Sequence, residues 1–310
     1  MVEGALRGRT ARRARAMMRR MQTVALLTPR WTAPQSFLED LALDLAVGEP
    51  AVACRTVALR PLMGRSEPEC WNFLLHLMAE LAGPDADRRP LPIVGSRSGF
   101  QHAAEYLLDR ADDEVEMPAA LLAHGAEHVP VDVLKDLADA WGQYHHRSGA
   151  DRRIGLLVAG AVATPVLLDS MDATLDLGDY GQAEAAATLV MQLGPVPNAM
   201  LQRAARFSGG VPSLVQALAA GVTERAVLPT DTDAMLRCLG GMADEIRAAV
   251  SMAVMNLDVA ERFYAISDGA SHPEIPALDE PLRMAGLIRR VRTGASARVE
   301  LRSPALALVG

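Results

Sequence analysis

The sequence predicts an α/β protein whose first half forms a parallel sheet with helices on both faces, and whose second half is helical. Short apolar runs alternate with amphipathic segments up to about residue 170, which is the pattern of βαβ units. Beyond that point the strand signal disappears, and helical patterns continue until a final hairpin. One run, residues 154–159, is apolar throughout, as expected for a strand covered on both faces.

The predicted strands of the first half are residues 23–27, 55–60, 119–123 and 154–159. The predicted helices between them are 37–47, 69–81, 100–110 and 131–147. We expect Ser36 to cap the first of these helices, because a serine side chain can accept a hydrogen bond from the first turn.

The second half predicts a short helical bundle over 182–193, 198–207 and 213–223. Three further helices, over 232–239, 242–255 and 259–266, precede strands at 287–292 and 298–301. The strands flank a turn at Thr293–Ser296. Three helices followed by a hairpin are the outline of a winged helix.

The composition is that of a folded chain, with 310 residues, 50% apolar and 22% charged. A net charge of -7 disfavours nucleic-acid binding by the protein as a whole. The charge is uneven, because residues 1–20 hold seven arginines against one glutamate. We expect this arm to be a solvated tail or a frayed helix. The alternative is that Arg12, Arg13, Arg19 and Arg20 contact nucleic acid or an acidic partner.

Three cysteines without paired spacing predict reduced thiols and no zinc site or disulfide framework. Every apolar run is too short to span a bilayer, and no signal-peptide core follows the basic arm. We therefore expect a cytoplasmic protein with no membrane partner.

Four local patterns occur along the chain in the order in which one protein family carries them. Thr28–Ser36 connects the first strand to the first helix, Ala119–Val129 and Ile154–Ala161 are strands with their following turns, and Gly209-Gly210-Val211-Pro212 opens a helix. From about residue 21 the chain resembles the STAND-type branch of the AAA+ P-loop ATPases. After the basic arm at 1–20, the resemblance implies a nucleotide-binding-like α/β domain at 21–170, a helical lid at 171–228 and a winged-helix domain at 229–310.

The chemistry of that family is missing at its phosphate loop. Such a loop uses glycines for close backbone approach, a lysine for the phosphates and Ser/Thr for magnesium. Thr28 and Ala33 stand at the glycine positions, Pro34 at the lysine position and Gln35 at the magnesium-ligand position, before Ser36. The chain's single lysine, Lys135, is too distant to shift into register, and Arg30 does not reproduce the lysine's geometry.

The Walker B position has also changed. His124 and Gly125 match the family's two carboxylates, and Ala161 replaces the polar sensor residue. Glu127 and His128 follow closely and are expected to be polar residues of an exposed turn. His124 and His128 do not form the zinc-protease motif, because the glutamate is not adjacent to the first histidine. We therefore expect no catalytic residue, no metal and no cofactor.

The resemblance with its losses predicts a pseudo-ATPase: a non-catalytic scaffold or adaptor for protein–protein assembly in a bacterial regulatory or defence complex. Expected partners are proteins, including further copies of the chain or a sibling ATPase. One alternative is a winged-helix DNA-binding regulator, and another is an ATPase subunit completed by a partner. The regulator would use the basic arm and the arginines of the last module, which are Arg283, Arg289, Arg290, Arg292, Arg298 and Arg302.

Overall fold

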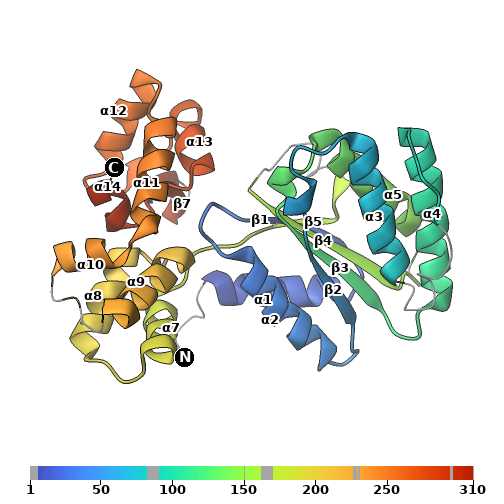
Figure 1. Ribbon diagram of the computed structural model, residues 1–310, viewed down its shortest axis with the longest axis horizontal. Helices are drawn as coiled ribbons and strands as arrows, with labels where there is room; N and C mark the ends of the chain where they lie inside the picture. Colours follow the sequence, from blue (N-terminus) through green and yellow to red (C-terminus); the bar gives the residue numbers. More distant parts are fainter. Residues whose placement is uncertain are drawn as a thin grey trace. The chain divides into compact units, whose positions relative to one another are not determined.

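The computed structural model describes residues 6–81, 91–149, 151–161, 170–225, 229, 231–293 and 296–309 (Figure 1). The chain divides into two compact units. The sheet unit consists of Arg9–Thr28 and Pro34–Leu177. The C-terminal unit consists of Met1–Gly8, Pro29–Ala33 and Gly178–Gly310. The loop Pro29–Ala33 therefore groups with the C-terminal unit although both of its ends lead into the sheet unit.

The sheet unit contains a five-stranded sheet in the order β2-β3-β4-β1-β5, and all of its strand pairs are parallel. The strands are β1 (Thr23–Leu27), β2 (Ala53–Ala58), β3 (Ala119–His124), β4 (Ile154–Gly160) and β5 (Ala173–Asp176). The register places Leu26 beside Ala159 and Ala123 beside Val158. This sheet confirms the predicted α/β class.

Helices cover both faces of the sheet (Figure 1). Helices α1 (Leu6–Met18) and α2 (Pro34–Ala46) share a core with Val24 and Leu26 of β1. Helices α3 (Glu67–Leu81), α4 (Arg97–Glu114) and α5 (Val131–Ser148) share the opposite core with Ala25. Successive strand residues point to opposite faces, so one short apolar strand supplies both cores.

The basic arm is a packed helix and not a solvated tail. Ala14 and Met18 of α1 are completely buried in the core beneath it. Thr10 lies one turn earlier and donates from Oγ1 to the carbonyl of Asp176 at 2.7 Å. These residues recur every four positions, so the helix has one face for packing while most of its arginines occupy the other.

Two further expectations need correction. A strand does follow residue 170, because β5 pairs with β1 at the sheet edge. It has four residues, of which only Leu175 is buried, so its apolar signal is weak. Helix α2 begins at Pro34, and Ser36 lies inside its first turn and does not precede the helix as a cap. Proline suits the first helical position because its N–H is not needed there.

The C-terminal unit is mainly helical. Its helices are α7 (Gln182–Leu193), α8 (Asn198–Ser208), α9 (Pro212–Arg225), α10 (Thr232–Cys238), α11 (Gly241–Ala253), α12 (Leu257–Ile266), α13 (Pro276–Met284) and α14 (Pro304–Val309). Strands β6 (His272–Pro273), β7 (Ile288–Thr293) and β8 (Ser296–Leu301) form an antiparallel sheet in the order β6-β8-β7. The tip of the predicted hairpin turn, residues 294–295, lies outside the described residues. Helices α13 and α14 were not predicted.

Within the described part of the chain, no helix has both the length and the apolar character that a membrane span requires. The thiols of Cys54, Cys70 and Cys238 are all free, as predicted.

Candidate functional site

The loop between β1 and α2 contains the residues that the sequence matches to the phosphate-loop position. At its start, the Thr28 N–H donates to the carbonyl of Gly160 at 3.0 Å. Thr32 then closes a tight turn, because its N–H and Oγ1 both donate to the carbonyl of Pro29, at 3.2 and 2.7 Å. Trp31 and Ala33 adopt left-handed backbone conformations, with φ of 68° and 49°. Non-glycine residues take this conformation at a cost, so the loop is held there by its surroundings.

The side chain of Trp31 helps to fix the loop in this conformation, because it lies in the core of the C-terminal unit. It is 8% exposed and belongs to the same apolar cluster as Leu214, Leu287 and Leu306. Its backbone is fixed as well, because the N–H of Ser213, at the start of α9, donates to the Trp31 carbonyl at 3.1 Å. The indole therefore anchors the loop in the second unit.

A buried ion pair holds the same loop from the end of β8. The side chains of Arg302 and Asp179 are 1% and 5% exposed, and Arg302 Nη2 lies 2.5 Å from Asp179 Oδ1. Arg302 Nε donates to Asp179 Oδ2 at 3.1 Å. Its Nη1 donates to the carbonyls of Arg30, at 2.7 Å, and Gly286, at 2.8 Å. The guanidinium of Arg302 thus connects the loop, Asp179 in the segment before α7 and the turn before β7.

Arg7 holds the other end of the loop. Its Nη1 donates to the Thr32 carbonyl at 2.8 Å and its Nη2 to the Ala33 carbonyl at 3.3 Å. The guanidinium also lies 4.9 Å from the centre of the Tyr180 ring, a cation–π distance. The arginine-rich arm therefore contributes a structural contact through the buried Arg7. We call Arg7, Trp31, Asp179 and Arg302 the loop clamp.

The Gly-Gly-x-Pro element makes the close contacts of this region possible. Gly209 has φ of 59°, and a Cβ added there would lie 1.9 Å from the carbonyl oxygen of Arg302. A Cβ on Gly210 would lie 2.0 Å from the carbonyl oxygen of Tyr180. Both glycines are needed because two backbone segments approach where any side chain would stand.

The residues at this loop do not fit a magnesium-bound triphosphate. Pro34 begins α2 and offers neither a charge nor an N–H at the lysine position. Gln35 is exposed, and its Nε2 donates to Glu39 Oε1 at 2.9 Å, one turn further along α2. Ser36 is half-buried within α2. The four carbonyls from Arg30 to Ala33 are bound to donors of the C-terminal unit.

The predicted Walker B position carries a histidine and a glycine. His124 ends β3 and is half-buried, and burial lowers its imidazole pKa, while Glu127 and Glu39 act in the opposite direction. Gly125 follows with φ of 83° and begins the short helix Ala126–His128. Glu127 is exposed, and its Oε2 accepts from the Ala161 N–H at 3.2 Å. The described residues contain no group of three His, Cys, Asp or Glu side chains suited to holding a metal ion.

Solved structures resemble the whole chain. A Walker-type ATPase of Pyrococcus abyssi matches with a TM-score of 0.67 over 98% of this chain and 95% of its own, at 13% identity. Cdc6p from Pyrobaculum aerophilum matches with a TM-score of 0.47, 15% identity and coverage of 98% and 91%. A STAND protein with a tetratricopeptide repeat sensor from Pyrococcus horikoshii gives 0.46 and 9%, over 96% of this chain and 41% of its own. No protein-family model and no curated protein matches the sequence.

The chain has the AAA+ P-loop ATPase fold. At 13% identity the first of these structures supports the fold alone, and the other two have TM-scores too low to add to it. The AAA+ fold explains why the β1–α2 loop and the end of β3 lie at the carboxyl edge of one parallel sheet, where ligands bind in such folds.

The arginines predicted to contact nucleic acid are placed unevenly on this AAA+ fold. Arg12, Arg13 and Arg20 are exposed on the sheet unit, and Arg19 is half-buried. The arginines of the last module are bound internally. Arg289 Nε donates to Glu300 Oε1 at 2.7 Å, Arg290 Nε to Glu274 Oε1 at 2.9 Å and Arg298 Nε to Ser271 Oγ at 2.8 Å. Arg302 is buried in the clamp, and the side chain of Arg292 lies outside the described residues.

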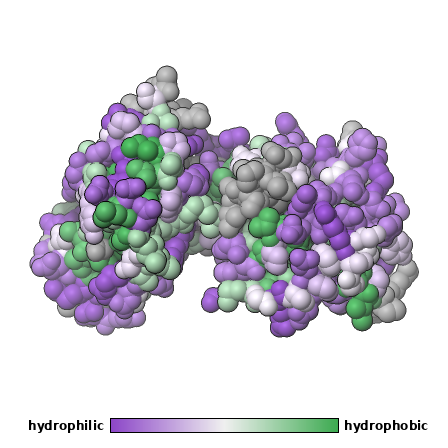
Figure 2. Space-filling view, turned by 90° about the horizontal axis from the view of Figure 1, so that it is seen from above, coloured by the Kyte–Doolittle hydropathy of each residue, from purple (hydrophilic) through white to green (hydrophobic). Residues whose placement is uncertain are grey.

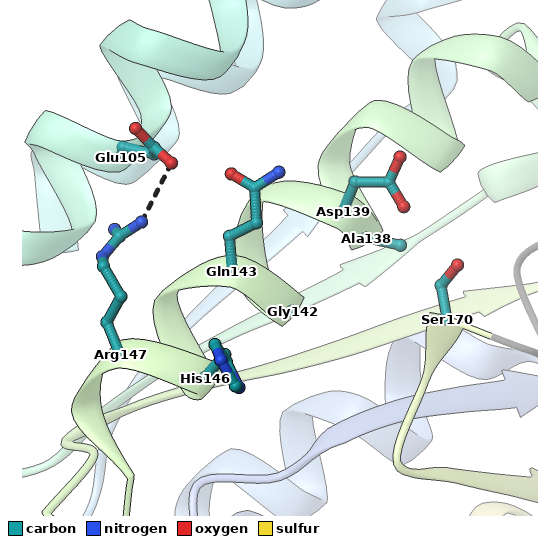
Figure 3. Close-up of a pocket in the computed structure, with 8 residues that line it drawn as sticks. All are labelled: Glu105, Ala138, Asp139, Gly142, Gln143, His146, Arg147 and Ser170. Atoms are coloured by element: carbon teal, nitrogen blue, oxygen red, sulfur yellow. Dashed lines mark hydrogen bonds and ion pairs between the residues drawn. The ribbon is translucent and has the colours of Figure 1, made fainter.

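A shallow hollow of about 490 Å³ lies elsewhere, between α4 and α5 (Figure 3). It is lined by Glu105, Ala138, Asp139, Gly142, Gln143, His146, Arg147 and Ser170. Arg147 forms two ion pairs there. Its Nη1 lies 2.9 Å from Glu105 Oε1 (Figure 3), and its Nη2 lies 2.9 Å from Asp109 Oδ1. Ser170 precedes β5, so the hollow lies toward the amino edge of the sheet and away from the edge where ligands bind in the AAA+ fold.

Sequence reasoning missed the loop clamp. It treated Arg7 as part of a solvated arm and Arg302 as a phosphate contact, and it gave Trp31 and Asp179 no role. One signal was present, because a tryptophan inside a loop that should be rich in glycine indicates burial against another element. The pairing of Asp179 with Arg302 gives no local signal, since 123 residues separate them.

Proposed function

We propose that this protein is a non-catalytic member of the AAA+ fold, a pseudo-ATPase that serves as a cytoplasmic scaffold or adaptor in a bacterial regulatory or defence complex. Its partners are proteins, either further copies of itself or a sibling ATPase. The helices and hairpin after residue 229 are the winged-helix module of this scaffold. The observation that carries the proposal is the loop clamp, which uses the phosphate-loop position for packing.

Energetics support this reading. Nucleotide could bind at the loop in the family manner only if Trp31 left its core and the carbonyls changed partners. Truncating a buried tryptophan costs about 3–5 kcal/mol, and breaking a buried ion pair costs about as much again. Binding with micromolar affinity yields about 8 kcal/mol in total. Releasing the clamp would therefore consume most of the free energy that a nucleotide offers.

The test is calorimetry with MgATP and MgADP, combined with a phosphate-release assay on the full chain. We expect no binding heat and no turnover above that of a blank preparation. The matched variant is Arg302→Met, which loosens the clamp without adding any catalytic group, so it too should show no turnover. Saturable binding, or turnover that follows the protein through purification, would refute the proposal.

A second candidate is electrostatic binding of nucleic acid through α1. Arg9, Arg12, Arg13 and Arg20 are exposed and form no ion pair among the described residues, whereas Arg15 pairs with Asp44. The test is a salt titration of binding to a DNA duplex. Arg12→Ala/Arg13→Ala should reduce the slope of log K against log salt by about two if each contacts one phosphate, and Arg290→Ala should leave it unchanged. The absence of a salt-dependent shift would remove this candidate.

A further inference from the structure

Helices α11 and α12 carry an exposed apolar surface around the turn that joins them. Met252 in the last turn of α11 is 61% exposed, and Met255 in the turn after that helix is 86% exposed. Leu257 and Tyr264 of α12 are 74% and 63% exposed. Leu257 and Tyr264 are seven residues apart, so they lie on one face of α12. Figure 2 shows hydrophobic surface on the C-terminal unit. We call these four residues the α11–α12 surface.

These side chains are not needed for the core of the unit. The inner faces of the same helices already bury Ile246, Val250, Val259 and Phe263, each at most 4% exposed. An amphipathic helix that packs through one apolar face usually presents polar residues on the other. Clustered apolar residues on that outer face therefore indicate contact with something outside the unit.

The exposed charges of α11 and α12 that are not paired with another described residue are negative. Arg247 pairs with Asp244 at 2.5 Å, and Arg262 pairs with the nearly buried Asp279 at 2.7 Å. The charged residues of α11 and α12 that have no ion pair among the described residues are Glu245, Asp258 and Glu261, which are all exposed carboxylates. The α11–α12 surface thus combines flexible apolar side chains with three exposed carboxylates on the same two helices, which we call its acidic rim.

Apolar side chains beside carboxylates favour some binding partners over others. Nucleic acid would meet repulsion from the carboxylates. A second copy using the same surface would bring two acidic rims together, at a cost of like-charge contact. A helix with an apolar stripe flanked by lysine or arginine fits both features, and methionine side chains adapt readily to such a stripe.

We propose that the α11–α12 surface binds a basic amphipathic helix of a partner protein. The inference rests on the proposed role in assembly and specifies the chemistry of the partner. The winged-helix module after residue 229 then contributes a protein-docking face, while arginines of this module form ion pairs and hydrogen bonds within the C-terminal unit.

The probe is a fluorescein-labelled peptide of leucine and lysine, about five helical turns long, with leucine at amphipathic spacing. Its binding to the full-length protein is followed by fluorescence anisotropy. Controls are a scrambled peptide of identical composition and a leucine–glutamate peptide of the same pattern. The variant Met255→Gln/Leu257→Gln removes two exposed anchors, and Met191→Gln, at a methionine of α7 that is 84% exposed, is the matched control.

We expect the basic peptide to bind, the two control peptides to bind weakly or not at all, and the double variant to lose affinity by about tenfold or more. Met191→Gln should bind like the unmodified protein, and Glu261→Gln should weaken binding mainly at low salt. Equal binding of the scrambled peptide, or an unaffected double variant, would overturn the proposal. So would self-association, seen by sedimentation, that the double variant abolishes. Nucleotide calorimetry tests the pseudo-ATPase proposal independently of peptide binding. A failure of the docking proposal is therefore distinguishable from a failure of the pseudo-ATPase proposal.

Discussion

Replacing Arg302 with methionine tests the loop clamp most sharply. The substitution leaves Asp179, 5% exposed, without its closest cation and removes the donor from two carbonyls. Deleting one partner of a buried pair costs about 3–5 kcal/mol. Arg289 lies 3.6 Å from Asp179 and still partly compensates the buried negative charge of Asp179. The expected loss in the free energy of unfolding is therefore at the lower end, about 3 kcal/mol. The C-terminal unit should therefore unfold at markedly lower urea concentration.

Trp31 provides the readout. Of the three tryptophans, Trp71 and Trp141 belong to the core of the sheet unit, and Trp31 belongs to that of the C-terminal unit. In a Trp71→Phe/Trp141→Phe background, urea unfolding followed by fluorescence reports the C-terminal unit alone. With a urea dependence of about 2 kcal/mol per molar, we expect the midpoint to fall by about 1.5 M.

The clamp is further tested by two companion variants. Asp179→Leu/Arg302→Met removes both charges and should be less destabilised than Arg302→Met, since no buried charge is left unpaired. Arg290→Met breaks a half-exposed pair with Glu274 and should cost at most about 1 kcal/mol. A midpoint shift for Arg302→Met no larger than that of Arg290→Met would refute the reasoning.

Two other predictions concern backbone approach and pH. Gly209→Ala should destabilise the C-terminal unit by more than about 2 kcal/mol, because its Cβ would lie 1.9 Å from the Arg302 carbonyl oxygen. Gly194→Ala has similar φ, 73°, but open space, and should cost only about 1 kcal/mol in the same urea assay; equal losses would argue against the close approach. Burial lowers the pKa of His145, whose Nε2 lies 3.2 Å from the Ile154 carbonyl. Because the unfolded chain then binds the proton more tightly, the stability due to neutral His145 is fully present above about pH 6.5 and falls as the pH drops below it. His145→Gln should flatten this dependence in urea titrations of a Trp31→Phe protein, and an unchanged pH slope would contradict the assignment.

Much of the fold was predictable because its signals are local. Strands β1, β3 and β4 are apolar runs bounded by polar residues, and α7 begins and ends where its periodicity does. Edge strands and short helices were harder to predict from the sequence. Strand β5 buries one side chain, and the nine residues of α13 contain Pro281, so neither shows a clear period.

For the candidate site, the sequence predicts lost catalytic groups only through its family resemblance, and this remains a prediction. The resemblance to the AAA+ ATPases matches Pro34 and His124 to positions where that chemistry would need lysine and a carboxylate. The loop clamp depends on contacts between distant segments, such as Arg7 with Thr32 and Arg302 with Asp179, which no local pattern encodes. The same holds for the last module, where Glu274 and Glu300 neutralise arginines that look available in the sequence.

The central claim is that the β1–α2 loop is a packed anchor and not a nucleotide cradle. It is tested most directly by titrating the protein that retains only Trp31 with MgATP. The indole lies in the core beside the loop that would have to open, so its emission reports any opening. We predict blue-shifted emission, shielded from quenchers, that does not change up to millimolar nucleotide. A saturable change in Trp31 emission would contradict the account.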